Sequence, residues 1–89
     1  MLVEVRLFAN LKEAAGKESL FFEFPEPPTV RELLARLLEE QPALRKVLIG
    51  EGGYDDRYKV LVGTDIVFPE DFGRKAGTRF AILPPVSGG

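Results

Sequence analysis

Apolar and polar residues alternate over several short stretches of the chain, and this period of two is typical of strands that are buried on one face. The first stretch covers residues 3–8, and the second covers residues 19–24. The segment 10–15 between them favours a helix, which Gly16 ends. Because this connection is too short for a crossover, we expect the two strands to be antiparallel neighbours.

The same alternation returns in the second half of the chain. It predicts a strand over 58–62, a turn at 63–65 and a short partner strand over 66–68. Residues 79–83 form the last predicted strand, and we expect the polar segment 69–77 before it to be a loop. Two or three further strands therefore follow the first pair.

Between these two groups of strands, the apolar period changes to that of an α-helix. Thr29 and Glu32 have the spacing of a capping box, in which each side chain bonds to the backbone amide of the other residue. The apolar stripe that follows consists of Val30, Leu33, Leu34, Leu37 and Leu38. On the other face, Glu32 precedes Arg36 by four residues, which favours an ion pair. Pro42 ends this helix, and residues 43–49 are expected to form another short helical turn.

This order of elements predicts an α+β domain in which one long helix covers one face of a sheet. With 89 residues, the chain has room for one globular domain, residues 1–83, and an extended tail, residues 84–89.

Strand parity separates the apolar side chains of the predicted sheet into two groups. We expect one group to face the helix: Val3, Val5, Leu7, Phe80 and Ile82. The other group then faces away, and it comprises Phe8, Ala81, Leu83 and, on the short strand, Ile66. An apolar patch on an uncovered sheet face beside the tail predicts a docking site for a partner protein. The alternative is that a loop covers these side chains.

Composition excludes several kinds of chemistry. The chain has no cysteine and no histidine, which excludes disulfide scaffolds, thiolate or histidine catalysis and zinc sites. Its 12 basic and 14 acidic residues form no basic block, so we expect no nucleic-acid partner. No apolar run is long enough for a membrane span, and the opening residues lack signal-peptide features, so we expect a cytoplasmic protein. The acidic pairs at 55–56 and 70–71 are expected to be solvated rather than to bind a metal.

The strongest candidate for chemistry is the end of the chain. Its last six residues are Pro84, Pro85, Val86, Ser87, Gly88 and Gly89. The prolines hold this arm extended, and the glycines let a neighbouring protein close tightly around it. The arm can reach roughly 20 Å, at about 3.3 Å per residue. The alternative is an inert, frayed end.

Such an arm can deliver the α-carboxylate of Gly89 to partner enzymes. A free carboxylate is a poor electrophile because its leaving group would be oxide. Reaction with ATP would make an acyl-adenylate, from which a sulfur donor can displace AMP and leave a thiocarboxylate. The chain would then supply the reactive group, while its partners supply the acid–base residues.

Three segments resemble the small, sulfur-carrying subunit of molybdopterin synthase: residues 3–16, 28–34 and 83–89. The likeness covers most of the chain. Gly63 is a departure, because such proteins often carry asparagine there after a valine.

The resemblance implies a β-grasp, ubiquitin-like fold, with a mixed sheet of four to five strands and one main helix on one face. It implies that the chain is not an enzyme on its own and binds no cofactor. An E1-like adenylyltransferase would use ATP to activate Gly89, and a sulfur donor enzyme would complete the thiocarboxylate. The tail would then enter the large subunit of molybdopterin synthase and give its sulfur to a pyranopterin precursor. Residues 84–87 and the apolar patch are the candidate partner contacts.

Two other hypotheses stay open. Carriers for thiamine, tRNA thiolation and cysteine synthesis end similarly, as do some archaeal protein modifiers. The second hypothesis is therefore covalent modification, with Gly89 joined to a substrate lysine through an isopeptide bond. The third is an interaction domain whose Gly-Gly end is inert.

Overall fold

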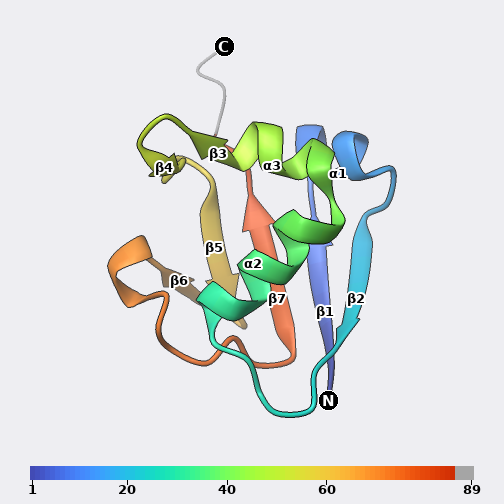
Figure 1. Ribbon diagram of the computed structural model, residues 1–89, viewed down its shortest axis with the longest axis vertical. Coiled ribbons are helices and arrows are strands. Elements are labelled where there is room, and N and C mark those ends of the chain that lie inside the picture. The colour runs from blue at the N-terminus through green and yellow to red at the C-terminus, as the bar shows by residue number, and fades with distance from the viewer. Residues whose placement is uncertain (86–89) are drawn as a thin grey trace.

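The strands predicted from alternation form one mixed sheet in the computed structural model, which describes residues 1–85 (Figure 1). The five strands are β1 (Leu2–Leu7), β2 (Ser19–Glu23), β5 (Lys59–Val62), β6 (Asp65–Val67) and β7 (Arg79–Leu83). Their order is β2-β1-β7-β5-β6. The first two strands are antiparallel neighbours as predicted, whereas β1 and β7 are parallel, so the last strand lies in the middle of the sheet.

Three helices complete the fold: α1 (Ala9–Ala15), α2 (Val30–Glu40) and α3 (Pro42–Leu48). Helix α2 lies across one face of the sheet, and α1 and α3 lie at the end of the sheet where β7 ends (Figure 1). Gly16 ends α1 in the left-handed region, with a φ of 76° that a residue with a Cβ rarely adopts. Pro42 both stops α2 and occupies the first turn of α3, where its missing N–H costs no helical hydrogen bond.

The predicted capping box begins α2. The Thr29 backbone amide donates to the Glu32 carboxylate at 2.8 Å, and the Glu32 amide donates to the Thr29 hydroxyl at 3.1 Å. A cap of this kind typically stabilises a helix by about 1 kcal/mol. The predicted ion pair between Glu32 and Arg36 is wrong, because the Glu32 carboxylate is occupied by the cap. Arg36 pairs instead with Glu40, one turn further along.

Two segments outside the predicted strands and helices contain regular structure. The glycine-rich segment 50–53 closes a small antiparallel pair, β3 (Ile49–Gly50) with β4 (Gly53–Tyr54). The polar segment 69–77 contains the 3₁₀ turn η1 (Pro69–Asp71) and buries Phe72 and Ala76. Its backbone carbonyls at Phe72 and Arg74 accept hydrogen bonds from the first amides of α2. This segment therefore covers the start of the main helix rather than forming an open loop.

The core lies between the sheet and the helices. The parity prediction is confirmed, because the five residues expected to face the helix are at most 1% exposed: Val3, Val5, Leu7, Phe80 and Ile82. The α2 stripe is buried against them as predicted. Within the described residues, no polar or charged residue is buried, so the core is wholly apolar. The face opposite to α2, here called the outer face, carries the remaining side chains of the strands.

Candidate functional site

The tail leaves from the end of the central strand. Strand β7 ends at Leu83, at the end of the sheet opposite to the N-terminus (Figure 1). Leu83 and Pro84 are half-buried, and Pro85 is exposed. Because β7 is hydrogen-bonded on both sides, by β1 and β5, the first residues of the tail have a rigid base. The predicted site residues Val86, Ser87, Gly88 and Gly89 lie outside the described residues.

Next to this base, strand pairing aligns a row of side chains across the outer face. Ala81 pairs with Arg6 on one side and with Leu61 on the other. Leu61 in turn pairs with Ile66 at the sheet edge. Ala81 and Leu61 are half-buried, and Ile66 is 54% exposed. The row is therefore apolar from the middle of the sheet to its β6 edge.

The other predicted docking residues lie beside this row. Phe8 and Leu83 directly follow the paired residues Leu7 and Ile82, so they stand next to each other in the register. The Phe8 side chain is 37% exposed, and the Arg6 guanidinium carbon lies 5.7 Å from the centre of its ring. The structure thus brings together all four patch residues that strand parity selected.

Two further residues belong to this surface and were missed from the sequence. Leu61 connects Ala81 with Ile66, and Phe68 follows β6 with 48% of its surface exposed. Both could have been found by parity, since Leu61 alternates with Val60, and Phe68 is two residues beyond Ile66. We call the complete set the outer patch: Phe8, Leu61, Ile66, Phe68, Ala81 and Leu83.

Basic side chains border the outer patch at the base of the tail. A hollow of about 400 Å³ is lined by Arg57, Lys59, Leu83, Pro84 and Pro85. The Lys59 ammonium donates to the Asp56 backbone carbonyl at 3.0 Å and lies 5.7 Å from the centre of the Phe68 ring. No ion pair within residues 1–85 involves Lys59. Its charge is therefore available to an anion beside the tail.

The charge of the neighbouring Arg57 is balanced by an ion pair with Asp55. Arg57 donates to both carboxylate oxygens of Asp55, at 3.0 and 2.7 Å. This pairing lowers the pKa of the Asp55 carboxyl and raises the pKa of the Arg57 guanidinium. The acidic pair at 55–56 thus serves a local turn. Among the described residues, no group of three acidic side chains is placed to hold a metal ion.

Comparison with known proteins identifies the family. The sequence profile described as the ThiS family matches residues 5–89, nearly the whole chain. The chain belongs to the ThiS family. Among curated relatives of this ThiS-family chain, small archaeal modifier protein 1 of Haloferax volcanii is 34% identical over 89 residues and covers 98% of this chain and 100% of its own. A molybdopterin synthase sulfur carrier subunit of Chlamydomonas reinhardtii is 31% identical over 90 residues, with both chains fully covered.

Solved structures agree with this assignment. The crystal structure of SAMP1 from Haloferax volcanii superposes on the ThiS-family chain with a TM-score of 0.86 at 33% identity, and both chains are fully covered. A complex of subunits 1 and 2 of the molybdopterin-converting factor from Helicobacter pylori gives a TM-score of 0.62 at 26% identity, again over both full chains. The predicted ubiquitin-like fold and the resemblance to sulfur-carrying subunits are confirmed. None of the helices in residues 1–85 is long and apolar enough to cross a membrane.

Proposed function

We propose that this chain is a sulfur carrier and serves as the small subunit of a cytoplasmic molybdopterin synthase. The observation that carries the proposal is the Gly-Gly pair that follows, in the sequence, the end of the central strand, where Leu83 belongs to the outer patch. The ThiS profile includes this pair, because the match extends through Gly89. The names of the Chlamydomonas and Helicobacter relatives support the molybdopterin branch.

In this proposal, the reactive group is the carboxylate of Gly89. An E1-like partner uses ATP to form the acyl-adenylate and releases pyrophosphate. A sulfur donor enzyme then delivers a hydrosulfide equivalent to the acyl carbon, where a C–S bond forms, the C–O bond to AMP breaks and AMP leaves. Gly88 and Gly89 suit these steps because no side chain obstructs the approach to the acyl carbon. ATP is bound by the partner, and the chain itself holds no cofactor.

The outer patch is proposed to hold the large subunit. It adjoins the base of the tail, so a partner seated on it receives the arm in a fixed direction, which lowers the entropy cost of positioning Gly89. Residues 84–87 would contact the entrance of the partner's cleft. The Helicobacter complex of two subunits supports an assembly of this type.

A second candidate is covalent protein modification. The observation that favours protein modification is the similarity to archaeal modifier proteins. It is seen in the sequence and also in the structure, where SAMP1 superposes with a TM-score of 0.86. Here the same acyl-adenylate would pass to a lysine amine and form an isopeptide bond. Other sulfur-transfer routes, to thiamine, tRNA or cysteine, would use the same thiocarboxylate.

Mass spectrometry of the protein from its own host separates these functions. We expect the peptide that ends at Gly89 to carry the mass gain of one oxygen-to-sulfur exchange, and we expect a strain whose chain lacks Gly89 to lose molybdenum cofactor. A chain with an alanine added after Gly89 is the second test, because it keeps both glycines but displaces the carboxylate.

Covalent modification of other proteins by this chain would give a different result in the same mass-spectrometry experiment. Arg79 is the last basic residue, so trypsin would leave residues 80–89 attached to an acceptor lysine. That remnant, combined with normal cofactor levels without Gly89, would contradict molybdopterin synthesis and support modification. If the sulfur gain and the remnant are both absent and deletion of Gly89 has no effect, the end is inert.

A further inference from the structure

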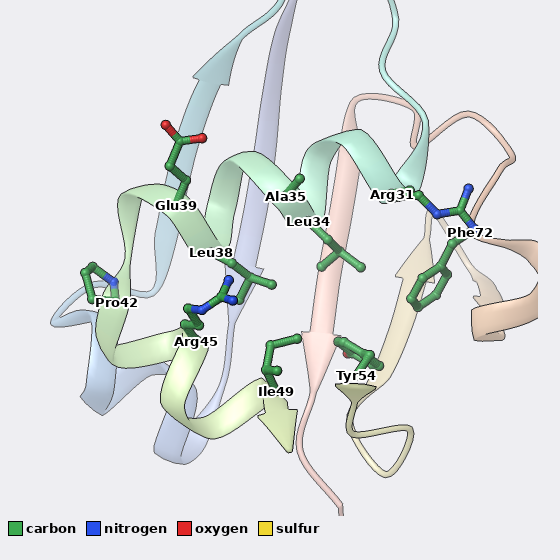
Figure 2. Close-up of a pocket in the computed structure, with 10 residues that line it drawn as sticks. All are labelled: Arg31, Leu34, Ala35, Leu38, Glu39, Pro42, Arg45, Ile49, Tyr54 and Phe72. Atoms are coloured by element: carbon green, nitrogen blue, oxygen red, sulfur yellow. The ribbon is translucent and has the colours of Figure 1, made fainter. Parts of the chain in front are cut away.

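A concave surface lies on the helix side of the molecule, between α2, α3 and the β3–β4 pair (Figure 2). We call it the helix-side groove, and its volume is about 640 Å³. It is lined by Arg31, Leu34, Ala35, Leu38, Glu39, Pro42, Arg45, Ile49, Tyr54 and Phe72. Helix α2 forms one wall, and α3 with the β3–β4 pair forms the other (Figure 2). This volume falls in the range of about 300–1,000 Å³ that is usual for binding sites.

The floor of the groove is apolar and rigid. Tyr54 and Phe72 pack edge to face, with ring centres 5.4 Å apart and an interplanar angle of 81°. The Tyr54 hydroxyl donates to the backbone carbonyl of Tyr58 at 2.8 Å, so the polar end of this ring is satisfied. Burial raises the pKa of this hydroxyl above its usual value, which keeps it neutral. The floor therefore offers apolar contact area and no charge.

The charges of the groove lie at its ends. Arg31 stands beside Phe72, and Arg45 stands beside Leu38 toward the other end (Figure 2). The Glu39 carboxylate, the one acidic group of the lining, points away from both (Figure 2). Residues 1–85 form six ion pairs, and neither arginine takes part in any of them. Two exposed arginines thus flank an apolar floor in a chain that has 14 acidic and 12 basic residues.

We propose that the helix-side groove binds a short acidic and apolar peptide segment of a partner protein. The apolar side chains of the peptide would cover the apolar floor, which Leu34, Leu38, Tyr54 and Phe72 form. The carboxylates of the peptide would pair with Arg31 and Arg45. Positions 31 and 38 are about 10 Å apart along the helix axis at 1.5 Å per residue. An extended peptide rises about 3.3 Å per residue, so it would span this distance when its acidic positions are about three positions apart, with two residues between them. Charge-assisted pairs at both ends would fix its register.

A bound peptide leaves the outer patch accessible. The groove uses the helix side of the fold, whereas the outer patch uses the opposite face of the sheet. The chain could therefore be held through its helices by one protein while the outer patch contacts another. Peptide binding in the helix-side groove is independent of the chemistry at Gly89. An experiment can therefore contradict this proposal without contradicting the proposed function.

Selection from a random dodecapeptide library displayed on phage tests the proposal with the full chain as bait. We expect enriched sequences that combine Leu, Phe or Ile with Asp or Glu. The synthetic consensus peptide should shift the backbone amide resonances of Leu34, Leu38, Ile49 and Tyr54. Failure to enrich any sequence, enrichment of basic sequences, or shifts confined to the outer face would overturn the proposal.

Matched variants locate the site and its charges. Ala35 lines the groove and is exposed, so Ala35→Gln should fill it without unfolding the helix and weaken consensus binding about tenfold or more. Ala43 is also exposed but lies outside the lining, and Ala43→Gln should bind normally. The double change Arg31→Glu and Arg45→Glu should abolish binding, and a peptide with lysine in place of its acids should restore it. Equal binding by the Ala35 and Ala43 variants, or no rescue by the lysine peptide, would count against the groove or against its charge preference.

Discussion

Gly63 begins the turn between β5 and β6 with a φ of 61°, in the left-handed region. A Cβ added there would meet no atom within 4 Å, so the position is limited by backbone conformation and not by space. Asparagine tolerates this conformation better than other residues with a Cβ. Small molybdopterin synthase subunits often carry asparagine at this position. Because glycine and asparagine both adopt the left-handed conformation, Gly63 preserves the turn.

Replacement of this glycine gives a graded test. Gly63→Asn should change the free energy of unfolding by no more than about 0.5 kcal/mol. Gly63→Val should cost about 1–2 kcal/mol, because a β-branched residue is strained at positive φ. Urea unfolding of the three proteins measures both values. Equal losses for asparagine and valine would show that the turn needs glycine for another reason.

Which side chains face the core could be predicted residue by residue. Alternation assigned Val5 and Ile82 inward and Ala81 outward, and burial confirms this. Phe72 and Ala76 could not be assigned in this way, because single apolar residues in a polar segment carry no period. Their burial depends on distant segments: Phe72 packs against the Tyr54 ring, and the Ala76 amide donates to the Pro28 carbonyl.

The capping box at the start of α2 joins two elements that are distant in sequence. Thr29 and Glu32 satisfy each other's amides, and the segment after η1 supplies the carbonyls of Phe72 and Arg74 to the next two amides. The cap was predictable because its residues are three positions apart. The added carbonyls were not, because about 40 residues separate them from the helix start.

The cap predicts a pH-dependent stability. Hydrogen bonds from Thr29, first its backbone amide and then its side chain, lower the pKa of Glu32 below its usual 4.5. A lowered pKa means that the charged carboxylate stabilises the folded state above pH 4.5, and that this stabilisation is lost as the pH falls through the lowered pKa. The protein should therefore unfold at a higher temperature than Glu32→Gln at pH 7, and the two midpoints should converge at acidic pH. Thermal unfolding from pH 7 to pH 2 measures this, and a constant difference would contradict it.

The molecule as a whole presents two different faces. One side of the sheet is covered by helices that carry the groove, and the other side is open and carries the outer patch. The α+β class followed from the order of periodic segments. The parallel pairing of β1 with β7 did not follow from any pattern along the chain, because it joins segments about 75 residues apart. The mixed sheet was expected only through the family resemblance.

The open face offers a matched pair of substitutions. Phe8 and Phe21 are both exposed on the outer face, but Phe8 borders the tail base, whereas Phe21 lies on the edge strand β2. Phe8→Glu should weaken binding to a molybdopterin synthase large subunit about tenfold, since buried aromatic contacts dominate interfaces. Phe21→Glu should leave the affinity unchanged. Calorimetric titration measures both, after circular dichroism has shown that each variant is folded. Equal affinities for the two variants would argue against the outer patch as the docking site.

The central place of β7 has a consequence for synthesis on the ribosome. Until Arg79 to Leu83 have emerged, β1 and β5 have no strand between them, and each exposes a row of unpaired amides and carbonyls. A nascent product that stops before this strand lacks the middle of its sheet, so we expect it to be cleaved by proteases faster than the full chain. Completion of the globule is thus coupled to the arrival of the strand that leads into the tail, so the tail base and the finished sheet form together.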